Sequence, residues 1–192
     1  MFEPSPLKRA IDIAFALPLA VVSAPVCLLL MLAVRMESPG SPLLVQERVG
    51  RNQRPFRLFK LRTMYRDTPN VASHEVGRSR ITRLGAVLRK LKLDELPQLI
   101  NVLEGTMSLV GPRPCLPSQH ELIAEREQRG VFRLRPGVTG PAQLLGIDMS
   151  TPRRLAEVEA EYFKSSTAWG EVALIARTFL GRGHGDAARI GG

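Results

Sequence analysis

The sequence predicts a small α/β domain, mostly helical, that an N-terminal apolar helix attaches to a membrane. Three observations predict this fold: residues 13–34 form an apolar run without a charge, several later segments have helical periodicity, and short extended segments lie between turns. We therefore divide the chain into a membrane segment at residues 1–36, a globular domain at residues 37–180 and a glycine-rich tail at residues 181–192 that we expect to be disordered.

The apolar run is long enough to cross a bilayer core, because a helix of this length reaches about 33 Å. Pro18 and Pro25 interrupt the run, and Pro25, with Ser23 close by, should kink the helix. Both flanks are basic, and the positive-inside rule places basic flanks in the cytoplasm. The flanking residues are Lys8 and Arg9 before the run and Arg35, Arg48, Arg51 and Arg54 after it. The residues alone leave two topologies open: a single span, or a kinked helix that enters and leaves the same leaflet.

The composition indicates a polyanionic partner, because the 192 residues carry a formal net charge of +9. Aromatic residues are only 5% of the chain, which argues against the stacking platforms that bind single-stranded nucleic acid. Cys27 and Cys115 lie far apart, so neither a disulfide framework nor a zinc site is expected. The sequence also lacks the glycine-rich motifs of P-loop and dinucleotide-binding proteins and the Gly-x-Ser-x-Gly motif of serine hydrolases.

Beyond the membrane segment we expect two short extended segments, a third before a rigid turn, and five helices. The extended segments lie at residues 45–49, 56–61 and 107–110, and the helices at residues 82–90, 95–103, 117–129, 151–164 and 169–180. Gly105 should end the second helix, and Thr151 with Pro152 should begin the fourth. The last helix has few charges and begins with Trp169, so it either lies in the membrane interface or packs on the domain.

The most informative motif is the acidic pair Asp94-Glu95, which follows a strongly basic stretch and lies where a helix should begin, with Pro97 in the first turn of that helix. A carboxylate at a helix N-terminus among cations should be ionised at neutral pH. The residues leave three roles open for the pair: a helix cap without chemistry, a ligand of Mg²⁺, or a nucleophile that attacks phosphorus.

Three further segments could hold phosphate groups. Arg113 lies between Pro112 and Pro114, which restrict the backbone and direct a guanidinium that matches phosphate oxygens. Lys60 and Arg62 would share one face of a strand and form a phosphate cradle. The turn-rich segment at 136–143 would bring its backbone close to a ligand. Each segment is equally compatible with an ordinary solvated surface.

These motifs, taken in order, resemble those of the bacterial sugar transferases, the small monotopic polyprenol-phosphate phosphoglycosyl transferases. The resemblance covers residues 7–146. The matching motifs are Lys8-Arg9-x-x-Asp12, the proline-broken apolar run, Gln46-x-Arg48-x-Gly50, Phe56 to Lys60, Arg62-Thr63-Met64, Leu93-Asp94-Glu95-Leu96-Pro97-Gln98-Leu99, Asn101-Val102-Leu103, Met107 to Pro114 and Pro136 to Gly140.

The resemblance implies an enzyme that moves a sugar-1-phosphate from a UDP-sugar to undecaprenyl phosphate and releases UMP by a ping-pong route. It implies that residues 37–180 are the catalytic domain, that Asp94 is the nucleophile, and that Asp94 and Glu95 hold Mg²⁺. It also implies phosphate-binding, pocket and membrane residues. The phosphate-binding residues are Arg113, Lys60, Arg62 and Arg89; the sugar or nucleotide pocket contains Pro112, Thr139 and Gln143; Ser23 and Pro25 form the membrane kink; Lys8 and Arg9 anchor the chain at the membrane.

The resemblance further implies a kinked re-entrant membrane helix, interfacial amphipathic helices and a location on the cytoplasmic face of the bacterial inner membrane. The segment Gly146 to Pro152 departs from the common pattern near the expected sugar pocket; we favour an N-acetylated amino sugar as donor. No nucleic-acid partner is expected, and an oligomer is compatible with the sequence. Two competing hypotheses are a non-catalytic membrane-anchored scaffold of a glycan pathway, which would tolerate Asp94→Asn, and a membrane-attached nucleic-acid binder.

Overall fold

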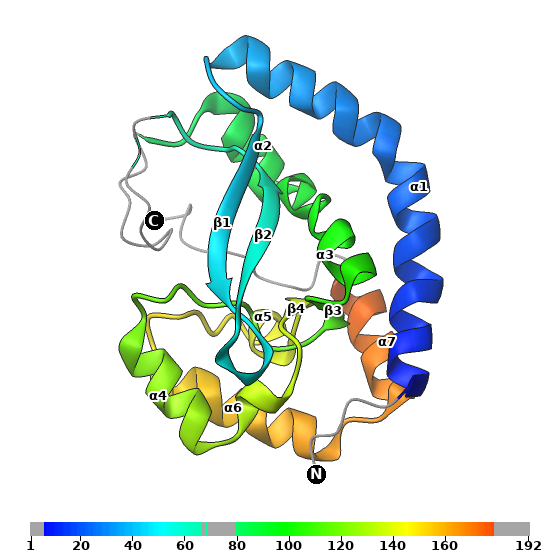
Figure 1. Ribbon diagram of the computed structural model, residues 1–192, viewed down its shortest axis with the longest axis vertical. Helices are drawn as coiled ribbons and strands as arrows, with labels where there is room; N and C mark the ends of the chain where they lie inside the picture. Colours follow the sequence, from blue (N-terminus) through cyan, green and yellow to red (C-terminus); the bar gives the residue numbers. More distant parts are fainter. Residues whose placement is uncertain (1–5, 67, 69–79, 179–192) are drawn as a thin grey trace.

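Helices dominate the computed structural model, which describes residues 6–66, 68 and 80–178 (Figure 1). The predicted disordered tail at 181–192 lies outside these residues. Two small two-stranded sheets complete the fold of the described chain. The helices are α1 (Pro6–Glu37), α2 (Arg83–Lys90), α3 (Gln98–Glu104), α4 (His120–Gln128), α5 (Pro141–Leu144), α6 (Pro152–Ser165) and α7 (Ala168–Arg177), with short 3₁₀ turns η1 (Arg51–Gln53), η3 (Leu93–Glu95) and η4 (Val131–Arg133); the strands are β1 (Leu43–Val49), β2 (Pro55–Leu61), β3 (Ser108–Val110) and β4 (Gly137–Thr139).

The two sheets have different pairings. β1 and β2 form an antiparallel hairpin that pairs Val45 with Phe59, as the two extended segments predicted. β3 and β4 pair in parallel, with Val110 opposite Thr139. The parallel pairing was not predicted, because residues 137–139 were interpreted as part of a turn. Their glycine- and proline-rich flanks look like a turn in sequence, whereas the partner strand lies far away along the chain.

The helix ends follow local chemistry. The side chain of Thr82 accepts a hydrogen bond from the backbone N–H of Gly85 at 2.9 Å and caps α2. Gly105 ends α3 with φ +84°, the left-handed conformation that glycine adopts without steric cost. Pro152 occupies the first turn of α6 as predicted, but Thr151 makes no side-chain capping bond. The second predicted helix was placed too early, because α3 begins at Gln98 and not at residue 95.

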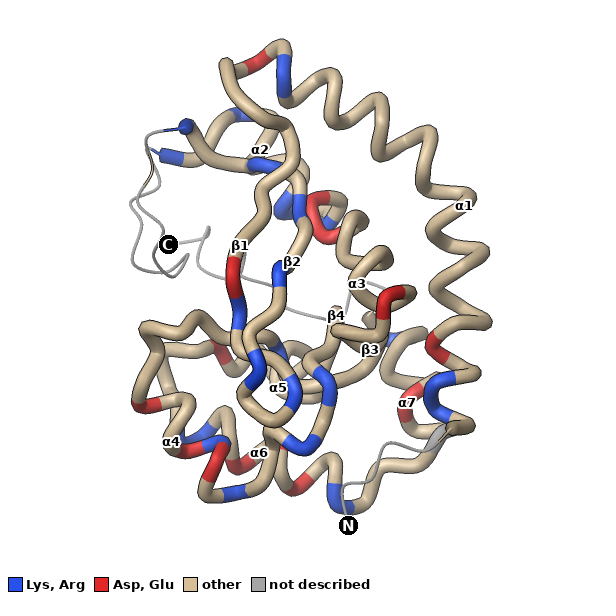
Figure 2. Tube along the Cα trace, in the orientation of Figure 1, with Lys and Arg blue, Asp and Glu red and all other residues tan. Residues whose placement is uncertain are grey.

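α1 is a continuous helix of 32 residues, long and apolar enough to cross a membrane by length and composition. Pro18 and Pro25 lie inside it, and each removes a backbone donor from the helical ladder. Ser23 donates a side-chain hydrogen bond to the carbonyl of Ala20 at 3.4 Å. Figure 1 shows that α1 bends part-way along the edge of the molecule, and Figure 2 shows that its charged residues gather near its two ends.

Both halves of α1 pack on the same globular domain. Ala16, fully buried, lies in an apolar cluster with Phe56 and Val102. Further along the helix, Val34 packs with Leu61 and Leu88 in a second cluster. The opposite face of α1 is exposed and apolar, and it includes Leu17, Val21, Val22, Val26, Leu28, Leu29 and Leu32. A contiguous exposed apolar face of this kind marks a membrane or protein contact.

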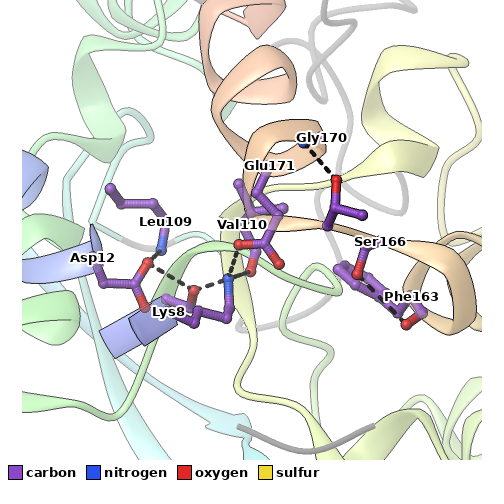
Figure 3. Close-up of polar contacts among 10 residues, drawn as sticks. Lys8, Asp12, Leu109, Val110, Phe163, Ser166, Gly170 and Glu171 are labelled. Atoms are coloured by element: carbon purple, nitrogen blue, oxygen red, sulfur yellow. Dashed lines mark hydrogen bonds and ion pairs between the residues drawn. The ribbon is translucent and has the colours of Figure 1, made fainter. Parts of the chain in front are cut away.

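Polar contacts fasten the first turns of α1 to β3 and α7 (Figure 3). The ammonium of Lys8 donates to the carbonyl of Val110 at 3.1 Å and pairs with Glu171 at 2.5 Å. Asp12, 2% exposed, accepts hydrogen bonds from the Ser108 hydroxyl and the Leu109 N–H, each at 3.0 Å. The start of α1 is therefore fixed to the strand that leads into the Pro112–Pro114 segment.

Arg9 also joins the first turn of α1 to the domain. Its guanidinium donates to the carbonyls of Val102 and Leu103 at 2.5 and 2.8 Å, at the C-terminal end of α3. A cation at this position compensates carbonyls that have no partner inside the helix. Lys8 and Arg9 therefore both contact the domain itself, and their membrane-anchoring role stays a prediction.

α7 packs on the domain through the side chain of Leu174. Leu174, 3% exposed, joins Val110 and Phe163 in an apolar cluster, with Ile175 packed against it. Trp169 is 83% exposed. Of the two interpretations of this helix, packing on the domain is confirmed for its Leu174 face, whereas Trp169 points away from the core.

Candidate active site

The acidic pair lies in the short 3₁₀ turn η3 that joins α2 to α3, and not in the first turn of α3. Lys92 precedes it with φ +56°, a left-handed conformation that reverses the chain after α2. Leu93 packs against the cluster of Val34, Leu61 and Leu88. Because that apolar side chain fixes the turn, the neighbouring Asp94 is held in place beside β2 and α2.

Asp94 is only 8% exposed, and its pKa is raised to about 6. Burial is the main cause and the negative charge of Glu95 the second, while Lys60, Arg89 and Arg113 oppose the rise. The sequence predicted an ionised carboxylate at a helix end. With this pKa, the ionised form of Asp94 exceeds the protonated form by only about tenfold at pH 7. The shift has the opposite direction from the one that the surrounding cations suggested, because removal from water outweighs them.

Glu95 is paired with the arginine of the Pro112-Arg113-Pro114 segment. Nη2 of Arg113 donates to Oε1 of Glu95 at 3.1 Å, and the two side chains are 23% and 17% exposed. This segment follows β3 and was predicted as a rigid turn, but the chain bends at Gly111 and has no turn at residues 112–116. Because the acidic pair lies between α2 and α3, the contact joins two motifs that are separate in sequence. Part of the Arg113 side chain faces solvent beside the acidic pair.

Two other cations complete the surroundings of Asp94. Lys60 extends from the end of β2, and Arg89 comes from the last turn of α2. Nε of Arg89 donates to the hydroxyl of Thr63 at 2.8 Å, which limits the movement of that guanidinium. Lys60, Arg89 and Arg113 therefore come together around Asp94, as predicted for phosphate-binding residues; their binding of phosphate stays a prediction.

Arg62 lies elsewhere. β2 ends at Leu61, and the Arg62 side chain turns toward the segment after α1. Its guanidinium donates to the carbonyls of Ser38 and Pro39 at 2.7 and 2.6 Å. Arg62 is 8% exposed, and burial lowers its pKa. The predicted cradle of Lys60 and Arg62 on one strand face is therefore not formed, because Arg62 lies beyond the end of β2 and its guanidinium binds the segment after α1.

The three predicted pocket residues gather at the β3–β4 pair. The N–H of Gly111 donates to the carbonyl of Thr139, and the N–H of Gly137 donates to the carbonyl of Pro112, both at 2.9 Å. Gln143 donates from Nε2 to the carbonyl of Val138 at 3.4 Å. Its Oε1 is buried and accepts no hydrogen bond within the described residues. Pro112, Thr139 and Gln143 thus lie together next to Arg113, and their contact with sugar or nucleotide stays a prediction.

The residues at this site fit Mg²⁺. Among the described residues no group of three or more His, Cys, Asp and Glu side chains could hold a metal by itself. Mg²⁺, however, is bound in many phosphate-transferring sites by one or two carboxylates, waters and the phosphates of the substrate. Asp94 and Glu95 supply two such carboxylates, and the mutual repulsion that raises the pKa of Asp94 would be relieved by a cation between them.

Two buried charged residues were not singled out from the sequence. Glu159 is 1% exposed and Arg126 is 2% exposed, and they form an ion pair between α6 and α4. A signal was present in the helical periodicity: Glu159 lies four residues after Leu155 and four before Phe163, on the apolar face of α6. Arg126 likewise lies four residues after the buried Leu122. A charge on the apolar face of each of two helices indicates a buried pair.

Comparison with known proteins identifies the family. The family model described as "Bacterial sugar transferase" matches residues 4–182 of the chain. The protein belongs to the bacterial sugar transferase family. The resemblance inferred from the ordered motifs is thereby confirmed over nearly the whole chain.

Several relatives in this family carry functional names. The chain is 39% identical over 180 residues to a UDP-glucose:undecaprenyl-phosphate glucose-1-phosphate transferase of Caulobacter vibrioides, covering 89% of the chain and 67% of the relative. It is 38% identical to an undecaprenyl-phosphate glucose phosphotransferase of Komagataeibacter xylinus, covering 88% of the chain and 34% of the relative. It is 34% identical to a UDP-N-acetylgalactosamine-undecaprenyl-phosphate N-acetylgalactosaminephosphotransferase of Aeromonas hydrophila, covering 91% and 44%. The chain thus spans less than half the length of the latter two relatives.

Proposed function

We propose that this sugar transferase moves a sugar-1-phosphate from a UDP-sugar to undecaprenyl phosphate and releases UMP. The observation that carries the proposal is Asp94, an almost buried carboxylate among the charges of Lys60, Arg89 and Arg113. A pyrophosphate donor and a phosphate acceptor are both anions, so the cations would offset their repulsion from the carboxylate. The names of the relatives support the same acceptor and the same reaction class.

The first half of the proposed reaction uses Asp94 as nucleophile. A carboxylate oxygen forms a bond to the phosphorus that bears the sugar, and the bond from that phosphorus to the bridging oxygen of the donor breaks. The bridging oxygen keeps the electron pair and leaves as part of UMP. The pKa of about 6 supports this role, because most of the Asp94 carboxylate is ionised at neutral pH while burial keeps it poorly solvated.

The second half returns the enzyme to its starting state. A phosphate oxygen of undecaprenyl phosphate attacks the same phosphorus, and the bond to Asp94 breaks to regenerate the carboxylate. The product is a lipid pyrophosphate that bears the sugar. Because the donor and acceptor react in turn, one set of cations serves both phosphates, which is a ping-pong route.

The remaining side chains would bind and orient. Arg113, restricted between two prolines and hydrogen-bonded to Glu95, is placed to hold a donor phosphate. Arg89 and Lys60 would neutralise the other phosphate oxygens. Asp94 and Glu95 would hold Mg²⁺, which when bound supplies positive charge for the departing UMP phosphate. Pro112, Thr139 and Gln143 would line the sugar or nucleotide pocket.

We further propose that α1 enters and leaves the same membrane leaflet, so that the site lies at the cytoplasmic face of the inner membrane. Its two ends bond to one domain: Arg9 binds the carbonyls that end α3, and the carboxylate of Glu37 accepts from the N–H of Leu84 in α2 at 2.9 Å. A spanning helix would place these ends on opposite sides of the bilayer. The exposed apolar face between them supports insertion, and the basic ends support a cytoplasmic position for both.

The donor sugar is to be decided by assay. The relatives' names include both glucose and N-acetylgalactosamine. The departure at residues 146–152 motivates our preference for an N-acetylated amino sugar.

The test is UMP release by the full chain in nanodiscs, with undecaprenyl phosphate, Mg²⁺ and a panel that contains UDP-glucose, UDP-N-acetylglucosamine and UDP-N-acetylgalactosamine. We expect release with at least one donor, and loss of release in Asp94→Asn. The matched control is Glu47→Gln, because Glu47 is an exposed carboxylate on β1 away from the pair. UMP release by Asp94→Asn at the wild-type rate would contradict the mechanism. A wild type that releases no UMP with any donor of the panel would favour a non-catalytic scaffold.

A further inference from the structure

The motif Gln46-x-Arg48-x-Gly50 covers the end of β1 and the first residue of the hairpin connection. Gln46 and Arg48 are two residues apart, so their side chains share one face of the strand. On that face they lie opposite Leu58 and Phe56 of β2, which are both buried in the apolar core. Two polar side chains of β1 are therefore directed toward the interior of the domain.

The guanidinium of Arg48 binds two oxygens at once. Its Nη2 donates to Oε1 of Gln46 at 2.5 Å, and its Nη1 donates to the backbone carbonyl of Pro114 at 3.2 Å. Gln46 is only 6% exposed and Arg48 is half-buried, so little water competes for these bonds. The Gln46 amide thus orients the planar fork of Arg48, and the other arm of the fork reaches the segment that follows β3.

The segment around Arg113 contains two prolines, which have no N–H to donate. Carbonyl oxygens fasten it on both sides. Before Arg113, the carbonyl of Pro112 accepts from the N–H of Gly137 in β4 at 2.9 Å. After Arg113, the carbonyl of Pro114 accepts from Arg48. Arg113 therefore lies between a backbone contact with β4 and a side-chain contact with β1.

β1 makes a second bond to the same segment. The N–H of Val49 donates to the carbonyl of Cys115 at 3.0 Å, so β1 binds two successive carbonyls, one through its backbone and one through Arg48. Two bonds at successive residues fix the direction of the segment as well as its distance from β1. Gly50 permits this arrangement, because a Cβ there would lie 2.8 Å from the carbonyl oxygen of Arg54 and would open the hairpin connection beside Val49.

We infer that Arg48 positions Arg113 for the donor phosphate by holding the backbone from which the Arg113 side chain extends. Nη2 of Arg113 reaches Oε1 of Glu95 at 3.1 Å, and a long side chain keeps such a placement only if the backbone beneath it is fixed. Small displacements of a binding group reduce rates strongly. The inference rests on the proposed function for its effect on rate, and on the contacts of β1 alone for its effect on the backbone.

The effect on the backbone is tested by single-residue amide hydrogen exchange of the full chain in nanodiscs, without substrate. Arg48→Met removes both donors of the fork and keeps an unbranched side chain on β1. The N–H of Val49, whose acceptor lies in the released segment, should exchange about tenfold faster or more. The N–H of Gly50 is the internal control, because it donates to the carbonyl of Arg54 within the hairpin connection at 2.9 Å. Unchanged exchange at Val49, or equal acceleration at Val49 and Gly50, would overturn the inference.

The effect on rate is tested by UMP release with the donor found above. The kcat/KM of Arg48→Met should fall by about tenfold or more. In an Arg113→Ala background the same substitution should cause at most about a twofold further loss, because its effect passes through Arg113. Arg48→Lys should recover part of the loss, since an ammonium can donate to one of the two oxygens but lacks the fork. The matched control is Arg57→Met, the same change at an exposed cation of β2, which should keep the wild-type kcat/KM.

The outcomes separate this inference from the proposed function. Wild-type kcat/KM in Arg48→Met, or the same fold-loss with and without the Arg113 side chain, would overturn the inference; the second result would leave Arg48 a purely structural role. If thermal unfolding shows that Arg48→Met does not fold, Arg48→Lys takes its place, and the same two results would overturn the inference. A wild-type protein that releases no UMP from any donor would count against the proposed function, whereas amide exchange at Val49 would still decide the inference.

Discussion

Arg113 and Glu95 form a direct hydrogen-bonded ion pair at 3.1 Å, although one belongs to the segment after β3 and the other to the turn before α3. Arg113 can therefore act on both members of the acidic pair. It binds the neighbour of the nucleophile, and its charge is one of those that lower the pKa of Asp94 against the effect of burial. Substitution of Arg113 should therefore change both substrate binding and the ionisation of Asp94.

Arg113→Ala is expected to reduce kcat/KM for UMP release by about 100-fold or more, which is the usual effect of removing one charge-stabilising donor from a site. Arg113→Lys should recover part of the loss, because it restores the charge without the forked geometry. The measurement is the initial rate against donor concentration. Arg57→Ala serves as control, since Arg57 is an exposed cation on β2. Equal rates for Arg113→Ala and Arg57→Ala would exclude a binding role for Arg113.

Asp94→Asn is expected to stabilise the metal-free protein while it abolishes activity. The pKa of Asp94 is higher in the folded protein, at about 6, than in an unfolded chain. This carboxyl therefore favours folding at pH values below about 4 and loses that contribution as the pH rises through 6. The free energy of unfolding of Asp94→Asn should therefore rise above that of the wild type as the pH increases from about 4 to 6. Above pH 6 the difference should stay constant, at no more than about 3 kcal/mol. Thermal unfolding of both proteins in EDTA at pH 4 and pH 8 measures this difference in stability. The same difference at both pH values would contradict the raised pKa.

The donor half-reaction should lose activity as the pH falls through 6, by about tenfold for each further unit, because the protonated Asp94 is not a nucleophile. Saturating Mg²⁺ should move this acid limb to lower pH, since a bound cation favours the ionised carboxylate. The single-turnover rate of UMP release without acceptor is the appropriate measure, because an acceptor phosphate itself titrates near pH 6. An acid limb that does not move with Mg²⁺ concentration would place the metal away from the pair.

The elements of this fold could be predicted where the signal is local. The two extended segments of the β1–β2 hairpin and the helix stop at Gly105 follow from neighbouring residues, and the structure confirms them. The parallel β3–β4 pairing could not be predicted, because it depends on contacts between residues about thirty positions apart. Arg62 shows the same limit within a motif: its position one residue beyond β2 decides its contacts, and element boundaries are not fixed by periodicity.

The candidate site was predicted in its composition and less well in its electrostatics. The ordered motifs contain the acidic pair and Arg113, the family resemblance added Arg89, and the fold brings these residues together. The sign of the pKa shift of Asp94 was not predictable, since the number of nearby cations is visible in the sequence whereas the burial that outweighs them is a tertiary property. The Arg126–Glu159 pair was missed because its two residues come from different helices.

Asp12→Ala is expected to destabilise the domain by about 2–3 kcal/mol. The substitution leaves the buried Leu109 N–H without an acceptor and removes a charged acceptor from the Ser108 hydroxyl, which retains the carbonyl of Val110 at 3.0 Å. Denaturant unfolding in a fixed detergent gives the free energy, and Glu47→Ala, an exposed carboxylate, is the control. If Asp12→Ala changed the free energy no more than the control, the docking of α1 on β3 would not contribute to stability.

The proposed topology predicts that both ends of α1 face the cytoplasm. Leu7 and Met36 are 63% and 78% exposed near the two ends, so a cysteine at either position should react with a membrane-impermeant maleimide. The background carries Cys27→Ser, and Trp169→Cys, at an exposed site of the globular domain, marks the side on which that domain lies. All three cysteines should react in inside-out vesicles and none in intact spheroplasts. A spanning helix would instead expose Leu7→Cys in spheroplasts. That result would also require the contacts of Lys8 and Arg9 with the domain to break, because the first turn of α1 cannot bind β3, α3 and α7 from across the bilayer.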